Sequence, residues 1–337
     1  MEDNYKKEQT VTFIKPPVII GRYSLVGKKE GQGNLKGYFD KVLEDDKFGE
    51  DTFEKSERKI METIVFKSID NANLTPSKID MFLSGDLLNQ IITSSFTARD
   101  FNTTFVGLYG ACSTMAESLA LASCLIDGGY FKNIACATSS HFSSAERQYR
   151  NPLELASQRS VVSQWTVTGG GCTILANKGK GHKITSATFG KVTDYGIKDT
   201  DNMGAAMAPA AMNTLVTHFR NTKTKPEDYD QIFTGDLGKL GKNILIDLML
   251  EKGYSLEKNY SDCGHMIFKD NQQAYQGGSG CGCSASVLNS YIYSKLDEGT
   301  FKKVLFVATG ALLSTISGQQ GESIPSIAHA VVIQKGD

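Results

Sequence analysis

The chain has 337 residues, of which 40% are hydrophobic, enough to bury the core of one large domain or two smaller ones. Its 36 basic and 37 acidic residues nearly cancel and form no long basic run, so the charge gives no reason to expect a nucleic-acid partner or a polybasic membrane anchor. No stretch approaches the roughly 18 consecutive apolar residues of a spanning helix, and the polar start "MEDNYKKEQT" is unlike a signal peptide.

The first predicted helix covers residues 57–69, where apolar residues recur at helical spacing. A turn then leads into a short apolar strand, "MFLS" at 81–84, which is followed by Gly85 and Asp86. Cys112 comes next, between small residues and just before a second helix at 116–126. The strands "NIACAT" at 133–138 and "GGGCTILAN" at 169–177 complete this first series of elements.

The second half of the chain repeats this series. "TPSKIDMFLSGDL" at 75–87 matches "KPEDYDQIFTGDL" at 225–237, and "IDGGYFKNIACAT" at 126–138 matches "LDEGTFKKVLFVAT" at 296–309. A glycine-rich turn at 277–285 precedes a predicted helix at 286–296, a strand follows at 303–309, and "IAHAVVIQK" at 327–335 echoes the strand at 169–177. Each half therefore reads as strand, small-residue turn, helix and strand.

Alternating strands and helices predict parallel sheets covered by helices, which is an α/β fold. Because the series occurs twice, we expect two pseudo-symmetric α/β halves packed as layered sheets and helices. The boundaries that we expect are 1–178 for the first half, which carries Cys112, and 179–337 for the second.

Cys112 is the first candidate site residue. It lies at a predicted helix start, where free backbone N–H groups and the helix dipole lower the pKa of a thiol and attract anions. A nucleophile and a carboxylate-binding pocket would both use this arrangement, and a small buried cysteine that packs a tight turn is the structural alternative. The seven cysteines, an odd number, indicate a reduced compartment and no disulfide framework.

Other polar residues follow the predicted strands. Ser140 and His141 end the motif "ATSSH", where ligands bind in parallel sheets, although a lone histidine there is often structural. Asp86 and Asp236 end the paired Gly-Asp turns and could orient a ligand, hold calcium or cap the next segment. We place Asp86 in the pocket, beside Cys112 and His141, and expect Asp236 to be a cap.

Two further motifs offer groups for an anion. Arg147 and Arg150 in "AERQYR" suit bidentate carboxylate recognition, or ion pairs at the surface. The run "GGSGCGCSA" around Gly280 and Cys281 allows close backbone approach to a ligand. Its single C-x-C has no second pair at zinc-type spacing, and the chain has no dinucleotide or P-loop fingerprint, so we expect no metal and no cofactor.

Eight motifs in order carry a family resemblance. The first group is "SGDLLNQ" (84–90), "GACST" (110–114), "ATSSH" (137–141), "AERQYR" (145–150) and "NMGAAMAPAA" (202–211). The second is "GGSGCGCSA" (277–285), "VATGALLS" (307–314) and "IPSIAHAVV" (324–332), together with the duplicated plan itself. The chain resembles the thiolase and β-ketoacyl synthase superfamily in plan. Over roughly residues 10–335 it resembles the thiolase-like stage V sporulation protein AD family of spore-forming bacteria.

This resemblance implies binding of dipicolinic acid, pyridine-2,6-dicarboxylate, or its calcium chelate, for uptake into the developing spore. The residues that we assign to ligand binding are Asp86, Cys112, Ser140, His141, Arg150, Gly280 and Cys281. The resemblance also implies a homodimer that works with other stage V sporulation membrane proteins, peripheral on the spore inner membrane, without nucleic acid.

Condensing enzymes of this superfamily need histidine or asparagine partners for their cysteine. The stretch that should carry the first, "IFTGDLGKLG", offers Asp236, and "QGGSGCGCSAS" offers neither histidine nor asparagine. We therefore expect a binding protein with no catalytic residues. The alternative is a residual thioester-dependent acyltransferase that uses Cys112 with His141 or His265.

Overall fold

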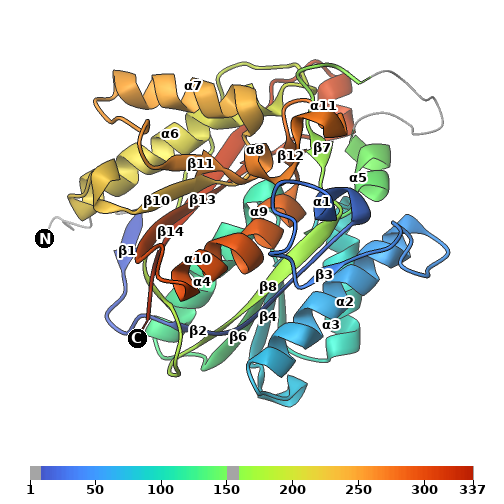
Figure 1. Ribbon diagram of the computed structural model, residues 1–337, viewed down its shortest axis with the longest axis vertical. Helices are drawn as coiled ribbons and strands as arrows, with labels where there is room; N and C mark the ends of the chain where they lie inside the picture. Colours follow the sequence, from blue (N-terminus) through green and yellow to red (C-terminus); the bar gives the residue numbers. More distant parts are fainter. Residues whose placement is uncertain (1–8, 150–158, 337) are drawn as a thin grey trace, which may run out of the picture.

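The computed structural model describes residues 9–149 and 159–336, and within them the chain is a mixed α/β structure (Figure 1). The strands are β1 (Thr10–Thr12), β2 (Val18–Val26), β3 (Lys41–Val42), β4 (Met81–Gly85), β5 (Phe105–Gly107), β6 (Asn133–Ser140), β7 (Trp165–Thr166), β8 (Gly169–Ala176), β9 (Lys183–Thr188), β10 (Gln231–Thr234), β11 (Tyr260–Asp262), β12 (Gly278–Ser279), β13 (Lys303–Ala311) and β14 (Ser326–Gln334). The helices are α1 (Lys28–Gly31), α2 (Phe53–Asn71), α3 (Ile92–Phe101), α4 (Thr114–Asp127), α5 (Phe142–Tyr149), α6 (Met203–Thr222), α7 (Gly238–Glu251), α8 (Cys263–Ile267), α9 (Cys281–Val287), α10 (Tyr293–Asp297) and α11 (Thr315–Gln319).

The strand order repeats between the two halves of the chain. The first half runs β2-β8-β6-β4-β5 and the second runs β9-β14-β13-β10-β11. In each half the two innermost pairings along this order are antiparallel and the two outer pairings are parallel. The halves are hydrogen-bonded to each other where Val18 of β2 pairs with Lys183 of β9. The α/β fold with a duplicated plan, predicted from the sequence echoes, is confirmed.

An equivalent aspartate, Asp80 or Asp230, closes the corresponding turn in each half of the chain. Asp80 accepts hydrogen bonds from the backbone N–H groups of Lys132 and Asn133 at 2.8 and 2.9 Å. Asp230 accepts from the N–H groups at 302 and 303, at 2.7 and 2.8 Å. Each aspartate thereby fixes the start of the strand that follows the central helix of its half, β6 in one case and β13 in the other.

Helices cover both faces of each half of the sheet (Figure 1). α2 packs on β2, β6 and β8 with α3 beside it, and α6 packs on β13 and β14 with α7 beside it. α4 and α9 lie between the two halves, because α4 contacts β6 as well as β13 and β14, and α9 contacts β6 and β8. The inner strands are therefore buried on both faces, which explains why they read as continuous apolar runs.

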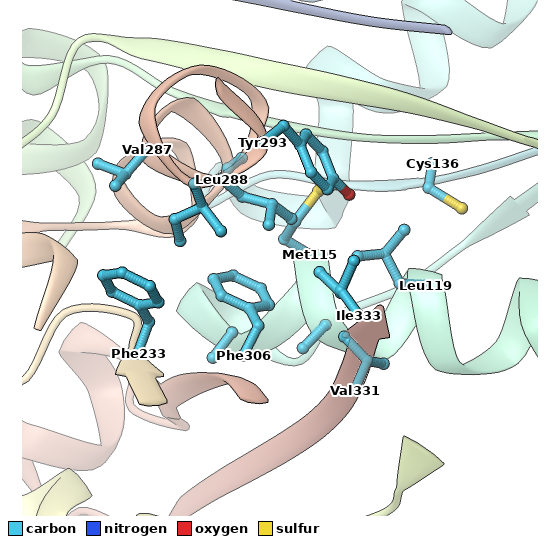
Figure 2. Packing of buried hydrophobic residues seen from close by; sticks show 14 of the residues in the cluster. Met115, Leu119, Cys136, Phe233, Val287, Leu288, Tyr293, Phe306, Val331 and Ile333 are labelled. Atoms are coloured by element: carbon cyan, nitrogen blue, oxygen red, sulfur yellow. The ribbon is translucent and has the colours of Figure 1, made fainter. Parts of the chain in front are cut away.

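The largest apolar cluster fills the space between the halves (Figure 2). Figure 2 shows Met115 and Leu119 of α4 facing Phe306 of β13 and Ile333 of β14, with Tyr293 of α10 on the other side. All five of these residues are fully buried. This packing fixes α4 and α9, and so fixes the turns that begin them.

Some helix boundaries differ from the sequence prediction. The helix predicted at 57–69 begins earlier, at Phe53, because the Thr52 hydroxyl caps it by accepting from the N–H of Lys55 at 3.2 Å. The helix predicted at 286–296 is divided into α9, a π-helical turn at Leu288–Ile292, and α10. No helix in the described residues is long and apolar enough to cross a membrane.

Candidate functional site

A hollow lies where the turns before α4 and α9 meet. The residues that line it are mostly apolar, with a few polar groups among them: Leu87, Tyr109, Ala111, Cys112, Ala145, Glu146, Thr166, Met203, Ser279, Ala311 and Leu313. The hollow has a volume of about 430 Å³, including the part that is open to solvent. This size suits a small ligand. We call this hollow the Cys112 cavity.

The Cys112 thiol reaches the cavity from a strained turn. Ala111, the residue before it, has a φ of +49°, a left-handed conformation that non-glycine residues rarely adopt. The hydroxyl of Ser113 donates to the carbonyl of Gly110 at 2.7 Å, and the hydroxyl of Thr114 donates to that of Ala111 at 2.7 Å. Local hydrogen bonds therefore hold the backbone that presents Cys112, whose side chain is almost fully buried.

Asp236 is the charged group nearest to this thiol. The Cys112 thiol and the Asp236 carboxyl lie within hydrogen-bonding reach, and the carboxyl also accepts from the hydroxyl of Thr309 at 2.9 Å. Its other oxygen accepts from the N–H of Gly280 at 2.9 Å and faces the hydroxyl of Ser279 at 3.3 Å. Burial raises the pKa of Asp236 to about 7, while burial and Asp236 raise the pKa of the Cys112 thiol well above its usual value.

The expectation that Asp236 caps the following segment is wrong. Asp262, at the end of β11, makes those bonds instead, accepting from the N–H groups of Leu237, Gly238 and His265 at 2.9 Å each. Asp236 makes none of these bonds. It lies behind the wall of the Cys112 cavity, where it accepts from the lining residue Ser279. In the sequence, Asp236 stands where a condensing enzyme of this superfamily is expected to carry a histidine. This position was the signal that pointed to a role for Asp236 at the site.

The glycine-rich turn of the second half meets Cys112 from the opposite side. Gly280 has a φ of +98°, and a Cβ added there would lie 2.9 Å from the Ser140 hydroxyl. The thiol of Cys281 donates to the carbonyl of Ser139 at 3.0 Å, and this side chain belongs to the same small apolar cluster as Cys112. The structure thus brings together three of the residues predicted for the site, namely Cys112, Gly280 and Cys281.

Ser140 and His141 lie behind the wall of the cavity. The Ser140 hydroxyl donates to the carbonyl of Val167 at 2.6 Å and accepts from the N–H of Gly282 at 3.2 Å. The Nε2 of His141 hydrogen-bonds the carbonyl of Asp46 at 2.7 Å, and its Nδ1 accepts from the N–H of Ser143 at 3.1 Å. Burial lowers the pKa of His141, which favours the neutral ring. Both side chains are committed to backbone partners.

Asp86 acts on the segment that leads into α3. Its carboxyl oxygens accept from the N–H of Leu88 at 3.0 Å and from the N–H and hydroxyl of Ser94 at 2.8 and 2.7 Å. The neighbouring Leu87 lines the cavity, whereas Asp86 does not. Burial raises the pKa of this carboxyl. Asp86 therefore positions part of the cavity wall.

The two arginines of "AERQYR" fall in different situations. Arg147 forms an ion pair with Glu54 at 3.7 Å, and its guanidinium lies 5.6 Å from the ring centre of Phe53. Arg150 lies outside the described residues, so its assignment to ligand binding stays a prediction.

Sequence reasoning missed two polar residues that line the cavity, namely Glu146 and Thr166. Glu146 is 6% exposed and accepts from the hydroxyl of Thr166 at 3.2 Å and from the guanidinium of Arg159 at 3.5 Å. Thr166 and Ser279 lie on the paired strands β7 and β12, whose two residues each are too short for a periodic pattern.

Three of the four remaining histidines have partners away from the cavity. His182 bonds Asp297 at 2.9 Å, His218 bonds Thr188 and Tyr229 at 2.8 Å each, and His329 accepts from a backbone N–H at 3.3 Å. His265 lies in α8. In the described part of the chain, no three side chains of histidine, cysteine, aspartate or glutamate are grouped so as to hold a metal ion.

Comparison with known proteins agrees with this architecture. The family described as stage V sporulation protein AD matches residues 7–334. The chain belongs to this family. The stage V sporulation protein AD of Bacillus subtilis (strain 168) is 43% identical over 328 residues, which cover 97% of this chain and 97% of that protein. Family membership and the sporulation context are therefore established, as the sequence motifs predicted.

Solved structures place the family on a thiolase-like fold. The 3-oxoacyl-[acyl-carrier-protein] synthase III of Aquifex aeolicus superposes with a TM-score of 0.58 at 14% identity, covering 94% of this chain and 99% of that one. OleA of Xanthomonas campestris gives 0.60 at 11% identity, covering 96% and 99%, and a thiolase of Ascaris suum in complex with coenzyme A gives 0.57 at 11%, covering 95% and 100%. At these identities the likeness concerns the fold alone.

Proposed function

We propose that the chain is a binding protein that captures dipicolinic acid, with or without calcium, in the Cys112 cavity for uptake into the developing spore. The observation that carries the proposal is the mainly apolar cavity lined by Cys112, in which Thr166 and Ser279 offer polar groups and the buried carboxyl of Asp236 lies behind the wall. Dipicolinic acid itself comes from the family resemblance, and the size and lining of the cavity support a small ligand with apolar and polar surfaces.

The surroundings of Cys112 argue against thioester chemistry. A nucleophilic cysteine acts as its thiolate, and its catalysis depends on donors that stabilise a developing oxyanion. Burial and the adjacent Asp236 raise the pKa of the thiol, and an ionised carboxylate there would repel an oxyanion. The histidines considered as bases, His141 and His265, do not line the Cys112 cavity. This supports a protein that binds without catalysing.

The lining matches the two kinds of surface that a pyridine dicarboxylic acid presents. Leu87, Met203 and Leu313 offer apolar contact to the faces of a ring. Thr166 and Ser279 offer hydroxyl groups to its polar edges. Within the proposal, Gly280 and Cys281 shape the cavity floor, while Asp86, Ser140 and His141 hold the backbone around it.

We also propose that the protein is a homodimer, peripheral on the spore inner membrane, that works with other stage V sporulation membrane proteins. Support for the dimer comes from β5, which ends the strand order with Val106 exposed, directly before the turn that carries Cys112. An unpaired strand edge is a template for a second chain. Analytical sedimentation of the wild type and of Val106→Lys tests this proposal. We expect a dimeric wild type and a monomeric variant. A wild type that is monomeric at micromolar concentration would contradict the proposal.

Calorimetric titration tests the binding function. Wild-type protein titrated with dipicolinic acid should give saturable heat, with and without calcium, and isophthalate, which lacks the ring nitrogen, should bind at least tenfold more weakly. Cys112→Trp, which fills the cavity, should abolish binding, whereas Cys124→Trp on a partly exposed face of α4 is the matched control. No heat with the wild type would contradict the proposal, and an acyl adduct on Cys112 by mass spectrometry would favour the acyltransferase.

A further inference from the structure

Two hydroxyl groups that line the Cys112 cavity, those of Ser279 and Thr166, donate their protons to carboxyl groups. The Ser279 hydroxyl faces an oxygen of Asp236 at 3.3 Å, and the Cys112 thiol lies against the same carboxyl. On the opposite wall, the hydroxyl of Thr166 donates to Glu146 at 3.2 Å. An ionised carboxylate accepts hydrogen bonds and cannot donate them, so it draws each of these protons away from the cavity.

At these two hydroxyl groups the cavity consequently shows lone pairs to whatever enters it. A hydroxyl has a single proton, and once that proton is donated backwards to a carboxylate, only the acceptor side of the oxygen remains. The backbone N–H of Gly280, which could otherwise meet an anion, is also taken by Asp236 at 2.9 Å. A fully ionised dicarboxylate would therefore meet acceptors and two fixed carboxyl groups, an arrangement that opposes its binding.

Resting on the proposed function, we propose that the Cys112 cavity takes its dicarboxylate together with one proton. The proton resides either on the ligand, as a carboxylic acid that donates to Ser279 or Thr166, or on Asp236, which then releases the Ser279 hydroxyl to donate into the cavity. With the proton in either place, one contact between a ligand oxygen and a lining hydroxyl, which would otherwise join two acceptors, becomes a hydrogen bond. Uptake of the ligand is thereby linked to pH.

The groups around Asp236 determine where this proton is held. Facing its carboxyl are the Cys112 thiol on the turn before α4, Asp262 at the end of β11, Cys263 on α8, and Cys281 and Cys283 on α9. Glu146 on α5, with Arg159, faces the cavity from the other wall. The immediate neighbours of Asp236 are thus carboxyl and thiol groups. Burial among them raises the pKa of Asp236 to about 7, so that the site changes protonation near neutral pH.

The number of protons bound with the ligand tests this inference on the wild type. Titrations with dipicolinate in calcium-free buffers that differ in ionisation enthalpy should show about one proton taken up per ligand at pH 8. Linkage then requires the affinity to fall about tenfold per pH unit above neutral pH. Binding with no proton uptake and equal affinity at pH 6 and 8 would overturn the inference and leave the proposed function intact, whereas no binding at any pH would overturn both.

Two carboxyl-to-amide variants assign the effect to Asp236. Asp236→Asn keeps the shape but supplies N–H donors, so proton uptake should disappear and binding at pH 8 should tighten. Glu30→Gln is the matched control, because Glu30 is equally buried, with its pKa raised by burial to about 8, but lines a different hollow. It should retain the wild-type proton count. Asp236→Asn with wild-type proton uptake would contradict the assignment.

Discussion

At the scale of single residues, the Cys112 cavity depends on backbone conformations that few side chains tolerate. Ala111 holds a φ of +49° immediately before Cys112, and Gly280 holds a φ of +98° on the facing turn. Such strain is typical of functional sites, because the surrounding structure must compensate for it. Here Ser113, Thr114 and Asp236 supply the compensating hydrogen bonds.

Gly280→Ala is expected to destabilise the fold by more than its backbone conformation alone explains. A left-handed φ costs a non-glycine residue about 1–3 kcal/mol, and the new Cβ would also lie 2.9 Å from the Ser140 hydroxyl and 3.3 Å from Thr166. Gly37 separates the two effects, since its φ is +96° and nothing lies within 4 Å of a Cβ there. Urea unfolding should show a larger loss for Gly280→Ala than for Gly37→Ala; equal losses would remove the steric part of the argument.

At the scale of elements, the two halves use the same devices at matching positions. Asp80 and Asp230 each accept two backbone N–H bonds at the start of β6 and β13. The Gly-Asp turns have diverged, because Asp86 holds α3 whereas Asp236 faces Cys112. The Cys112 cavity lies at the junction of the halves, where the turn of one half meets the turn of the other.

Removing either strand-start aspartate should cost similar stability. Each substitution, Asp80→Ala or Asp230→Ala, removes two exposed hydrogen bonds whose donors water can partly satisfy, and we expect losses of about 0.5–1.5 kcal/mol for each. Asp70→Ala is the control, since Asp70 makes an exposed ion pair with Lys67 at 3.4 Å and should change stability by no more than about 0.5 kcal/mol. Losses for Asp80 and Asp230 that matched this control would show that the bonds do not stabilise the strands.

Local patterns in the sequence predicted most of the elements and the duplication. The helices at 57–69 and 116–126 and the strands around 133–138 and 303–309 lie where apolar spacing placed them. The π-helical turn at Leu288–Ile292 was not predicted, because it leaves the apolar spacing almost unchanged. The contact of Asp236 with Cys112 was also missed, since residues so distant in the chain are brought together only by the packing of the two halves.

At the scale of the whole molecule, buried ionisable groups make the stability depend on pH. His218 and His329 are buried, and burial lowers the pKa of each to about 4. An unfolded histidine titrates near 6.5, so between pH 4 and 6.5 the unfolded chain binds more protons than the folded one. These histidines therefore contribute stability that is present above pH 6.5 and is lost as the pH falls towards 4.

Replacing His218 isolates its share of this effect. His218→Gln should be less stable than the wild type at pH 6.5, because the bonds to Thr188 and Tyr229 weaken. The gap should then narrow by about 1.4 kcal/mol per pH unit as the pH falls towards 4, since the variant has no proton to gain on unfolding. Urea unfolding at pH 4.5, 5.5 and 6.5 measures the gap, with half-buried His265→Gln as the comparison; a constant gap for His218→Gln would contradict the assignment.

The position of the ligand tests the central claim most directly. A crystal structure of the protein grown with dipicolinate at pH 6 should show the planar ring in the Cys112 cavity, in contact with Cys112, Thr166 and Ser279. Density for the ligand elsewhere, with this cavity empty in protein that binds dipicolinate in solution, would contradict the account.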